Sequence, residues 1–556
     1  MAQKELRFGD PSFREIRKGN FLYADKTEYI HKMIKTSKCC FLSRPRRFGK
    51  TLLLKTIDAL FQGDRMLFEG LWIDQSDYQF EPHPVLNFNM AYDEISTKDD
   101  LVSWIKWDLM RHAKREGVLL KSDFTSRQMF EVLLEDIYTK YGVGAVILVD
   151  EYDAPVTKHI SDLKLASANR DVLHDFYQSM KTNIDYIHFA LVTGITRFAM
   201  TSLDSGPNNF NDISLMPKFA GICGFTIREF KKLFKNRFKK TLKILKKSGD
   251  ISQDADVDAL KDMILNWYDG YNWLGHQNVL NPYSILNFFN EKRLRTYWPT
   301  TGTPSHLSQL AQARPLDFIQ PKLNSYLYQD IKMAELEKMS PGAILFHSGY
   351  LTIDRRISVE TVIHGETIKE EAFILKTPNR EVALHYKANI FMQIFKNTTE
   401  EFQNFSKNIS EALLNLNSHQ IANILQNLLS GITFKQHMPL EKYYHSLFHA
   451  AFVGAGIEVL SEIAGSEGQA DMAVFLDNKI RVVIELKYRH GGKYGGVAEN
   501  DRADKDIAVA LDEAEKAIRK KNYAGPFRLS STKIFCLALA VCGRDRVAAR
   551  FVDSDV

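Results

Sequence analysis

The chain has 556 residues, of which 45% are hydrophobic and 25% are charged, a composition typical of a globular protein with about two or three domains. The net charge of +5 permits nucleic-acid binding but does not by itself indicate it. No run approaches the roughly eighteen apolar residues of a membrane helix, and the N-terminal MAQKELRFGD lacks the apolar core of a secretion signal. Five cysteines without C-x2-C spacing are expected to be buried thiols in a cytoplasmic protein without a membrane partner.

The N-terminal region, residues 1–225, alternates apolar runs with helical stretches. The apolar runs at 39–42, 85–88, 145–149 and 188–193 predict an α/β domain with a largely parallel sheet. Asn89 follows the second run and could either contact a ligand or cap the chain end.

A candidate phosphate-binding loop follows the first apolar run. Residues 39–51 read CCFLSRPRRFGKT, and the amphipathic segment LLLKTIDALF comes next. In such a loop the helix N-terminus binds the β-phosphate, Lys50 reaches the β- and γ-oxygens, and the Thr51 hydroxyl binds Mg²⁺. Arg44 stands where the first glycine of G-x4-G-K-[ST] is usual, so Gly49-Lys50-Thr51 taken alone also fits an ordinary helix start.

A second motif supports nucleotide binding. Residues 145–155 read AVILVDEYDAP, a buried strand that ends in Asp150 and Glu151, and Asp150 follows Lys50 by 100 residues. Asp150 is expected to bind the Mg²⁺ shell and Glu151 to polarise the attacking water. The two motifs together predict a P-loop NTPase domain that uses ATP and Mg²⁺.

The following region, 226–340, has a helical pattern. Residues 231–247 carry nine Lys and Arg and no acid, and the apolar residues between them fall on one stripe: Phe234, Phe238, Leu242 and Leu245. This predicts one basic amphipathic helix with its cations outward, either as a contact for the DNA backbone or as a solvated lid helix. The aromatic segments WYDGYNW and YWPTTGTP are expected to form packed turns.

Residues 341–435 are predicted to form a connector, and residues 436–556 a last domain. In the connector, HSGYLTID and ETIKEEAFILKTP suggest a small sheet, followed by helices from Arg380 onward. The last domain begins with a helix that ends near Gly454 and continues with the strand IEVLSEI. Glu462 in that strand is either a further acid near a metal or a surface carboxylate, and a lone helical histidine such as His445 is more often structural.

The stretch 469–487, QADMAVFLDNKIRVVIELK, predicts a β-hairpin with its turn at residues 477–479. A three-residue turn places Asp471 opposite Glu485, and Lys487 projects from the same face of the strand. Two carboxylates in this position suit Mg²⁺, whose waters can attack a phosphodiester, while the lysine orients that water or offsets charge. An exposed hairpin with solvated charges is the simpler alternative.

These motifs resemble a bacterial family that joins an AAA-like ATPase domain to a C-terminal PD-(D/E)XK nuclease domain. The likeness extends over most of the chain: FLYADKTEYI, SRPRRFGKT, VILVDEYDAP, VTGITRF, WYDGYNW, NPYSILNFF, YWPTTGTPSHL, HSGYLTI and the final D-x13-E-L-K. In that family RPRRFGKT replaces the glycine-rich loop, so the resemblance implies nucleotide binding by Arg46, Arg47, Phe48, Gly49, Lys50 and Thr51. It also implies a sensor of the γ-phosphate at Thr193 or Arg197, although Arg197 equally suits a structural salt bridge.

The resemblance implies further a helical lid at 226–340 and a restriction-endonuclease-like α/β fold at 436–556. The catalytic groups would be Glu151 in the ATPase and Asp471, Glu485 and Lys487 in the nuclease, with metal bound by Thr51 and Asp150 and by Asp471 and Glu485. Two departures concern substrate access: Ala517 stands where the family has a glutamine, and the glycine-rich insert 490–506 follows Lys487.

The sequence thus predicts an ATP- and Mg²⁺-dependent nuclease of the cytoplasm. DNA is the expected substrate, RNA is left open, and a homo-oligomer is compatible with the chain. The alternative is an ATP-switched interaction or nucleic-acid-binding protein whose nuclease fold is catalytically silent. A toxin or effector role is not distinguishable from housekeeping use by sequence.

Overall fold

The computed structural model of the chain describes residues 4–9, 12–92, 94–159, 162–196, 210–276, 278–298, 326–327, 331, 340–363, 366–386, 399–431, 440–464, 469–476, 480–490, 497–521 and 533–552. It contains two compact units. The first consists of residues 1–307 and 323–383, and the second of residues 308–322 and 384–556. The predicted connector is therefore divided between the two units after Ala383.

A parallel sheet forms the centre of the first unit. Its order is β2-β3-β4-β1-β5, and every neighbouring pair is parallel. The bounds are β1 Cys39–Ser43, β2 Val85–Asn89, β3 Ala145–Asp150, β4 Ile187–Gly194 and β5 Phe210–Asp212. All residues of β1 and β3 are buried, as expected of a parallel sheet with helices on both faces. The predicted α/β domain with a largely parallel sheet is confirmed.

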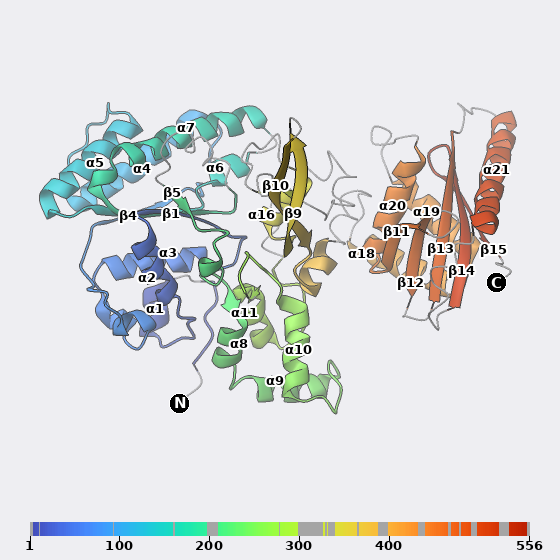
Figure 1. Cartoon of the computed structure of the whole chain (residues 1–556), viewed down its shortest axis with the longest axis horizontal. Helices are drawn as coiled ribbons and strands as arrows, with labels where there is room; N and C mark the ends of the chain where they lie inside the picture. The colour runs from blue at the N-terminus through green and yellow to red at the C-terminus, as the bar shows by residue number, and fades with distance from the viewer. Residues whose placement is uncertain are drawn as a thin grey trace. The chain divides into compact units, whose positions relative to one another are not determined.

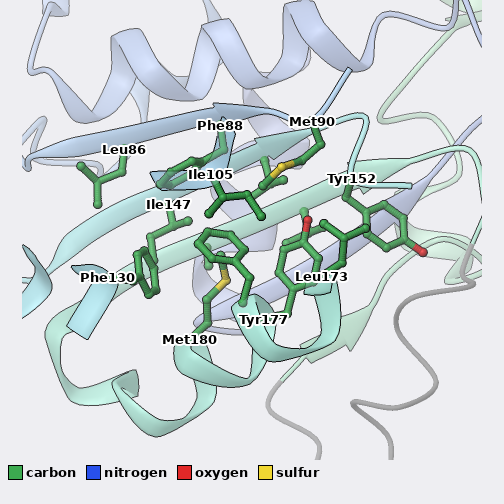
Figure 2. Close-up of a cluster of buried hydrophobic side chains, with 14 of the residues drawn as sticks. Leu86, Phe88, Met90, Ile105, Phe130, Ile147, Tyr152, Leu173, Tyr177 and Met180 are labelled. Carbon is green, nitrogen blue, oxygen red and sulfur yellow. The ribbon is translucent and has the colours of Figure 1, made fainter. Parts of the chain in front are cut away.

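Helices cover both faces of this sheet (Figure 1). On one face lie α4 (Lys98–Glu116), α5 (Ser126–Tyr141) and α7 (Leu163–Thr182); on the other lie α1 (Phe13–Lys18), α2 (Thr27–Thr36) and α3 (Lys50–Phe61). Figure 2 shows the core beneath the first group, where Phe88 and Ile147 of the sheet meet Phe130, Leu173 and Met180 of the helices. The shorter elements of the region are η1 Arg65–Phe68, η2 Trp72–Gln75, α6 Ala154–Thr157, η3 Ile184–Tyr186 and η5 Pro217–Phe219.

Local sequence explains where the covering helices begin and end. Both α4 and α5 start with a capping box, in which Thr97 or Thr125 accepts from a backbone amide three residues on. Both end at a glycine in the left-handed conformation, Gly117 and Gly142.

A helical group follows, with α8 (Ile227–Leu233), α9 (Phe238–Ser248), α10 (Val257–Tyr268) and α11 (Pro282–Glu291) beside the short pair β6 (Phe225–Thr226) and β7 (Val279–Leu280). The prediction of one continuous helix over 231–247 is wrong. The chain turns between α8 and α9, and this turn brings Arg237 to the interior, where its guanidinium donates to the carbonyl of Lys4. The predicted apolar stripe is nevertheless buried, with Phe234, Phe238 and Leu245 in the core.

The remaining described part of the first unit contains a small antiparallel sheet. Its order is β8-β10-β9, with β8 Tyr326–Leu327, β9 Thr352–Ile363 and β10 Glu366–Lys376. The helix α16 (Pro341–Ser348) lies between β8 and β9 in the chain. The small sheet expected from HSGYLTID and ETIKEEAFILKTP is confirmed. Residues 380–386 are helical, as the sequence predicted.

The second unit has a five-stranded sheet in chain order, β11-β12-β13-β14-β15. The strands are β11 Glu458–Ala464, β12 Gln469–Leu476, β13 Ile480–Arg489, β14 Lys533–Cys542 and β15 Arg546–Val552. Only β13 and β14 pair in parallel, and the chain between them contains α21 (Val497–Lys521). The predicted insert at 490–506 is therefore helical from Val497 onward, since α21 packs Ala510, Ala514 and Ile518 on this sheet.

Three further helices belong to the second unit: α18 (Thr399–Leu414), α19 (Ser418–Ser430) and α20 (Glu441–Gly454). They agree with the helices predicted over 400–430 and up to Gly454. All five cysteines are free and buried, as expected. In the described part of the chain, no helix is both long and apolar enough to cross a membrane.

Candidate functional sites

The loop between β1 and α3 has the backbone of an anion site. Gly49 is the N-cap of α3 and makes no side-chain cap hydrogen bond; its φ of +93° is one that residues with a side chain rarely adopt. A Cβ at Gly49 would meet no atom within 4 Å, so the space in front of the helix is open. A helix N-terminus with amides turned to open space attracts phosphate.

Lys50 is buried in this loop, with 7% of its surface exposed. Its ammonium donates to the carbonyls of Arg44 (2.8 Å) and Pro45 (3.1 Å). Burial lowers the pKa of Lys50, while the charges of Asp150 and Glu151 oppose that effect. An ammonium at the start of a helix can neutralise the negative charge of a phosphate bound there.

Asp150 at the end of β3 connects the loop with the neighbouring strand. Its Oδ2 accepts from the Thr51 hydroxyl at 2.6 Å, and its Oδ1 accepts from the Thr193 hydroxyl at 2.8 Å. Thr193 is fully buried, so it orients Asp150. Thr51 and Asp150 are hard oxygen ligands in contact, and they fit the few protein ligands that Mg²⁺ takes beside phosphate.

Glu151 and Asp153 follow in the same turn. Glu151 has a φ of +48°, a left-handed conformation that is uncommon outside glycine and concentrates at functional sites. Asp153 is buried and accepts from the backbone amides of Ile195 and Thr196 and from the Thr196 hydroxyl, which fixes the chain after β4. Burial raises the pKa of Asp153. Arg197, the other proposed sensor, lies outside the described residues.

The arginines of the loop have different positions. Arg44 is 1% exposed; it donates to the carbonyls of Ser43 and Ser214 and lies over the ring of Trp273. Burial lowers the pKa of Arg44 to about 10. Arg44 thus supports the loop from inside, where the usual pattern has a glycine. Arg46 is half-buried, whereas Arg47 is exposed with its guanidinium 5.1 Å from the ring centre of Tyr283.

Aromatic residues from the helical group support the same loop. Phe48 is buried against Tyr271 and Trp273, with ring centres 4.7 and 5.2 Å apart. Its ring therefore packs inside, and the nucleotide contact that the resemblance implied for Phe48 would be made by its backbone. The Trp298 indole donates to the carbonyl of Arg46 at 3.1 Å. These contacts give WYDGYNW and YWPTTGTP a role that the sequence did not reveal.

A hollow of about 650 Å³ opens beside Thr51 and Asp150. Its other walls include Asn89 at the end of β2 and two stacked aromatic rings, Tyr92 and Trp104, whose centres lie 5.4 Å apart. Asn89 also accepts from the amide of Ala91, so it caps the chain as well as lining the hollow. The volume is in the range of ligand pockets and gives a terminal phosphate and a water room beside Asp150.

The second site lies on the hairpin of β12 and β13. The ladder ends with Met472 opposite Ile484, and Asp471 and Glu485 are the next residues of the two strands, which agrees with the predicted register. The turn 477–479 lies outside the described residues. The Leu486 amide donates to Asp471 Oδ2 at 2.7 Å. Glu485 is 1% exposed.

Lys487 completes this group. Its ammonium lies 3.1 Å from Glu485 Oε1 and 2.9 Å from the carbonyl of Leu486. Burial alone lowers the pKa of Lys487, but the negative charges of Glu485, Glu441 and Asp471 outweigh it and raise the pKa. The lysine is therefore charged at neutral pH, and the oxygen atoms of Glu485, Glu441 and the Leu486 carbonyl surround its ammonium.

Two helix residues next to the hairpin were not assigned a role from sequence. Glu441, in the first turn of α20, accepts from Lys487 (3.4 Å) and from the amide of Tyr488 (3.0 Å). His445 Nε2 lies 2.8 Å from the carbonyl of Asp471, which gives the histidine a positioning role on the site's backbone. A glutamate four residues before a histidine at a helix start is the signal that could have indicated this pair. The side chain of Glu462 is outside the described residues.

The oxygen ligands at this hairpin fit one kind of divalent cation site. Among the residues that the structure describes, no cluster of three or more His, Cys, Asp or Glu side chains is placed to hold a metal. Mg²⁺ often takes only one or two carboxylates and keeps waters or substrate phosphates as its other ligands. Asp471 and Glu485 on one face of the hairpin therefore fit Mg²⁺ in that mode.

Comparison with known proteins gives matches to both regions. Residues 7–204 match a family described as predicted AAA-ATPases, and residues 440–551 match the PD-(D/E)XK nuclease superfamily. A protein described as uncharacterized, in the vnfD 5′ region of Azotobacter chroococcum mcd 1, is 29% identical over 578 residues, with 99% of each chain covered. Among solved structures, the Aeropyrum pernix Orc1 protein in complex with DNA matches 66% of this chain and 93% of its own, with 10% identity and a TM-score of 0.24.

Proposed function

We propose that this chain, in which an AAA-ATPase-like domain precedes a C-terminal domain of the PD-(D/E)XK nuclease superfamily, hydrolyses ATP and cleaves DNA under ATP control. The contact between Thr51 and Asp150 carries the first half of this proposal. The convergence of Asp471, Glu485 and Lys487 on one face of a hairpin carries the second half.

In the ATPase site, the amides after Gly49 and the ammonium of Lys50 would bind phosphate. Thr51 and Asp150 would hold Mg²⁺, which offsets phosphate charge when bound. Glu151 would accept a proton from water at the edge of the hollow, and Thr193 would keep Asp150 in place.

In the nuclease site, Asp471 and Glu485 would hold a divalent cation, which supplies an acidic water and a positive charge when bound. Lys487 would then stand beside the scissile phosphate, where its charge favours the transition state. His445 and Glu441 would position the hairpin and the lysine. These groups contact neither base nor sugar, so RNA is a second substrate class to test.

The ATPase half is tested with calorimetry and phosphate release. Lys50→Ala should weaken ATP binding by at least about 100-fold, because the remaining amides cannot neutralise the phosphates. Asp150→Ala should lose hydrolysis, and Glu151→Gln should bind ATP without turnover. Lys18→Ala, which removes an exposed lysine at the end of α1 away from the hollow, is the matched control and should behave as wild type. Tight binding by Lys50→Ala would exclude this loop as the phosphate site.

The nuclease half is tested by cleavage of plasmid DNA with Mg²⁺ or Mn²⁺, with and without ATP. Asp471→Ala and Glu485→Ala should reduce cleavage to background by removing a metal ligand. Lys487→Ala should do so while Mn²⁺ binding persists, and Lys533→Ala, on the exposed end of β14, should cleave normally.

A silent nuclease fold is the second candidate. The absence of a cluster of three metal-binding side chains among the described residues favours it. Wild-type protein that binds Mn²⁺ and cleaves neither DNA nor RNA under any nucleotide condition would establish this alternative.

A further inference from the structure

The helices α8 and α9 carry a concentrated positive surface. Seven lysines of these helices and of the turn between them are exposed, and together they form the lysine surface: Lys231, Lys232, Lys235, Lys239, Lys240, Lys243 and Lys247. No acid occurs in the chain between Glu229 and Asp250. An ordinary solvent-exposed helix pair carries charges of both signs, whereas this segment carries positive charges only.

Neighbouring acids do not neutralise this surface. Glu229 forms an ion pair with Lys26, and Asp258, the acid whose pKa Lys231 helps to lower, forms one with Lys261. Among the described residues, no ammonium of the lysine surface lies within 4 Å of a carboxylate oxygen. The positive charges are therefore available to a partner.

The apolar side of the same helices is already used. Phe234 stacks on Phe289 of α11 with ring centres 4.5 Å apart, and Phe238 packs on the same ring at 5.7 Å. Leu245 is fully buried. An amphipathic helix binds a bilayer by inserting its apolar face, whereas α9 packs its apolar stripe inside and exposes Ile244 as its large apolar side chain. The partner must instead be recognised by charge.

The spacing of the lysines suits a regular polyanion. Lys239, Lys243 and Lys247 are four residues apart, so they follow one another on one side of α9 at intervals of roughly 6 Å. Along the eleven residues of α9, roughly 16 Å, duplex DNA presents about nine phosphates. Phosphate contacts of this kind add affinity without reading sequence.

We propose that the lysine surface of α8 and α9 binds the phosphate backbone of duplex DNA. This inference rests on the proposed function, because it supplies the site at which the nuclease's substrate is held by the ATPase unit. It predicts binding that does not depend on sequence and weakens steeply with salt.

The test uses the full-length protein, a fluorescently labelled 30-base-pair duplex, and anisotropy measured in EDTA so that no cleavage takes place. The triple variant Lys239→Glu, Lys243→Glu and Lys247→Glu should bind the duplex at least about 100-fold more weakly at low salt. The slope of log K against log salt concentration should be smaller in magnitude by about 2 to 3. The matched control replaces Lys98, Lys114 and Lys164 by Glu; these lysines are exposed on α4 and α7. Both triples change the net charge equally, from +5 to −1.

Each outcome has a defined meaning. Equal losses in the two triples would show that net charge alone matters and would overturn the proposal, as would an unchanged affinity in the α9 triple. Binding of vesicles rich in phosphatidylserine, with none of DNA, would identify a membrane partner instead. An RNA duplex bound far more tightly than DNA would also overturn it. DNA binding is measured without metal, so a wild-type protein that fails to cleave can still show binding by the lysine surface. A failure of ATP binding is also distinguishable, because Lys50→Ala leaves the lysine surface intact.

Discussion

At the scale of single residues, Glu381 is a buried acid whose ionisation affects the support of the phosphate loop. It is 1% exposed; its Oε1 accepts from the amides of Tyr297 (2.5 Å) and Trp298 (2.9 Å), and its Oε2 from the Ser284 hydroxyl (2.8 Å). Trp298 in turn donates to the loop carbonyl of Arg46. Burial raises the pKa of Glu381 to about 7, although the three hydrogen bonds act in the opposite direction.

The stability of the first unit should consequently fall as the pH rises through neutrality. The folded protein binds the Glu381 proton more tightly than the unfolded chain does. The contribution of this proton to the free energy of unfolding is therefore complete below about pH 4.5 and lost above about pH 7. It amounts to about 3 kcal/mol at most. Melting temperatures at about pH 5 and pH 8 should differ less in Glu381→Gln than in wild type, by a few degrees. Glu135→Gln, which replaces an exposed carboxylate on α5, should leave the difference between the two melting temperatures as in wild type. If Glu381→Gln also leaves it unchanged, Glu381 is ionised at both pH values.

At the scale of elements, the candidate phosphate-binding loop between β1 and α3 is supported by residues far along the chain. The loop from Arg44 to Gly49 is contacted by Tyr271, Trp273 and Trp298, and the Tyr271 hydroxyl donates to the carbonyl of Gly349. The conformation of the loop is thus set by segments more than 200 residues away.

Weakening that support should lower ATP affinity without unfolding the sheet. Trp298→Phe removes the indole donor to Arg46 and keeps an aromatic ring, at a cost of about 1 kcal/mol, or roughly fivefold in Kd. Calorimetry of ATP binding measures this, and circular dichroism reports the fold. Trp72→Phe, at an exposed tryptophan, is the control and should bind ATP as wild type does. Equal affinities in all three proteins would mean that the loop holds its shape unaided.

The sequence sufficed for features that depend on local pattern. Strand runs, the GKT turn and the Asp150 strand end follow from apolar periodicity and turn chemistry, and the register of Asp471 against Glu485 follows from the length of one turn. It did not reveal the interior position of Arg44, the buried side of Phe48 or the role of Glu441. Each of these depends on contacts between distant segments, such as Lys487 with Glu441, which no local pattern records. The break between α8 and α9 has the same origin, in the contact of Arg237 with Lys4.

At the scale of the whole molecule, the chain contains two compact units. The second unit includes α18 and α19 as well as the nuclease-like sheet. Gln426 of α19 accepts from the amide of Val547 in β15 (3.3 Å), and Ser406 of α18 donates to the carbonyl of Ala455 (2.8 Å). Of the two helices, α19 therefore packs on the sheet of the second unit, and α18 packs on α19 and α20.

A fragment of residues 384–556 should fold more stably than one of residues 436–556. The shorter fragment exposes the apolar surface that α18 and α19 bury, so its melting temperature should be lower by at least about 5 °C. Circular dichroism melts of the two fragments make the comparison, with Mn²⁺ binding as a check on the site in each. Identical melting curves would show that the two helices add nothing to this unit and that 436–556 is the complete domain.

The hydrogen bonds of Lys50 have a consequence for how the chain responds to ATP. The ammonium donates to two carbonyls of its own loop, Arg44 and Pro45, so a phosphate would accept from its third N–H, and it would gain more of this cation only when one of those bonds breaks. The observed affinity is then the intrinsic affinity reduced by the fraction of molecules in which the loop is open. Such a site fills over a higher range of ATP concentration than one whose lysine is already exposed.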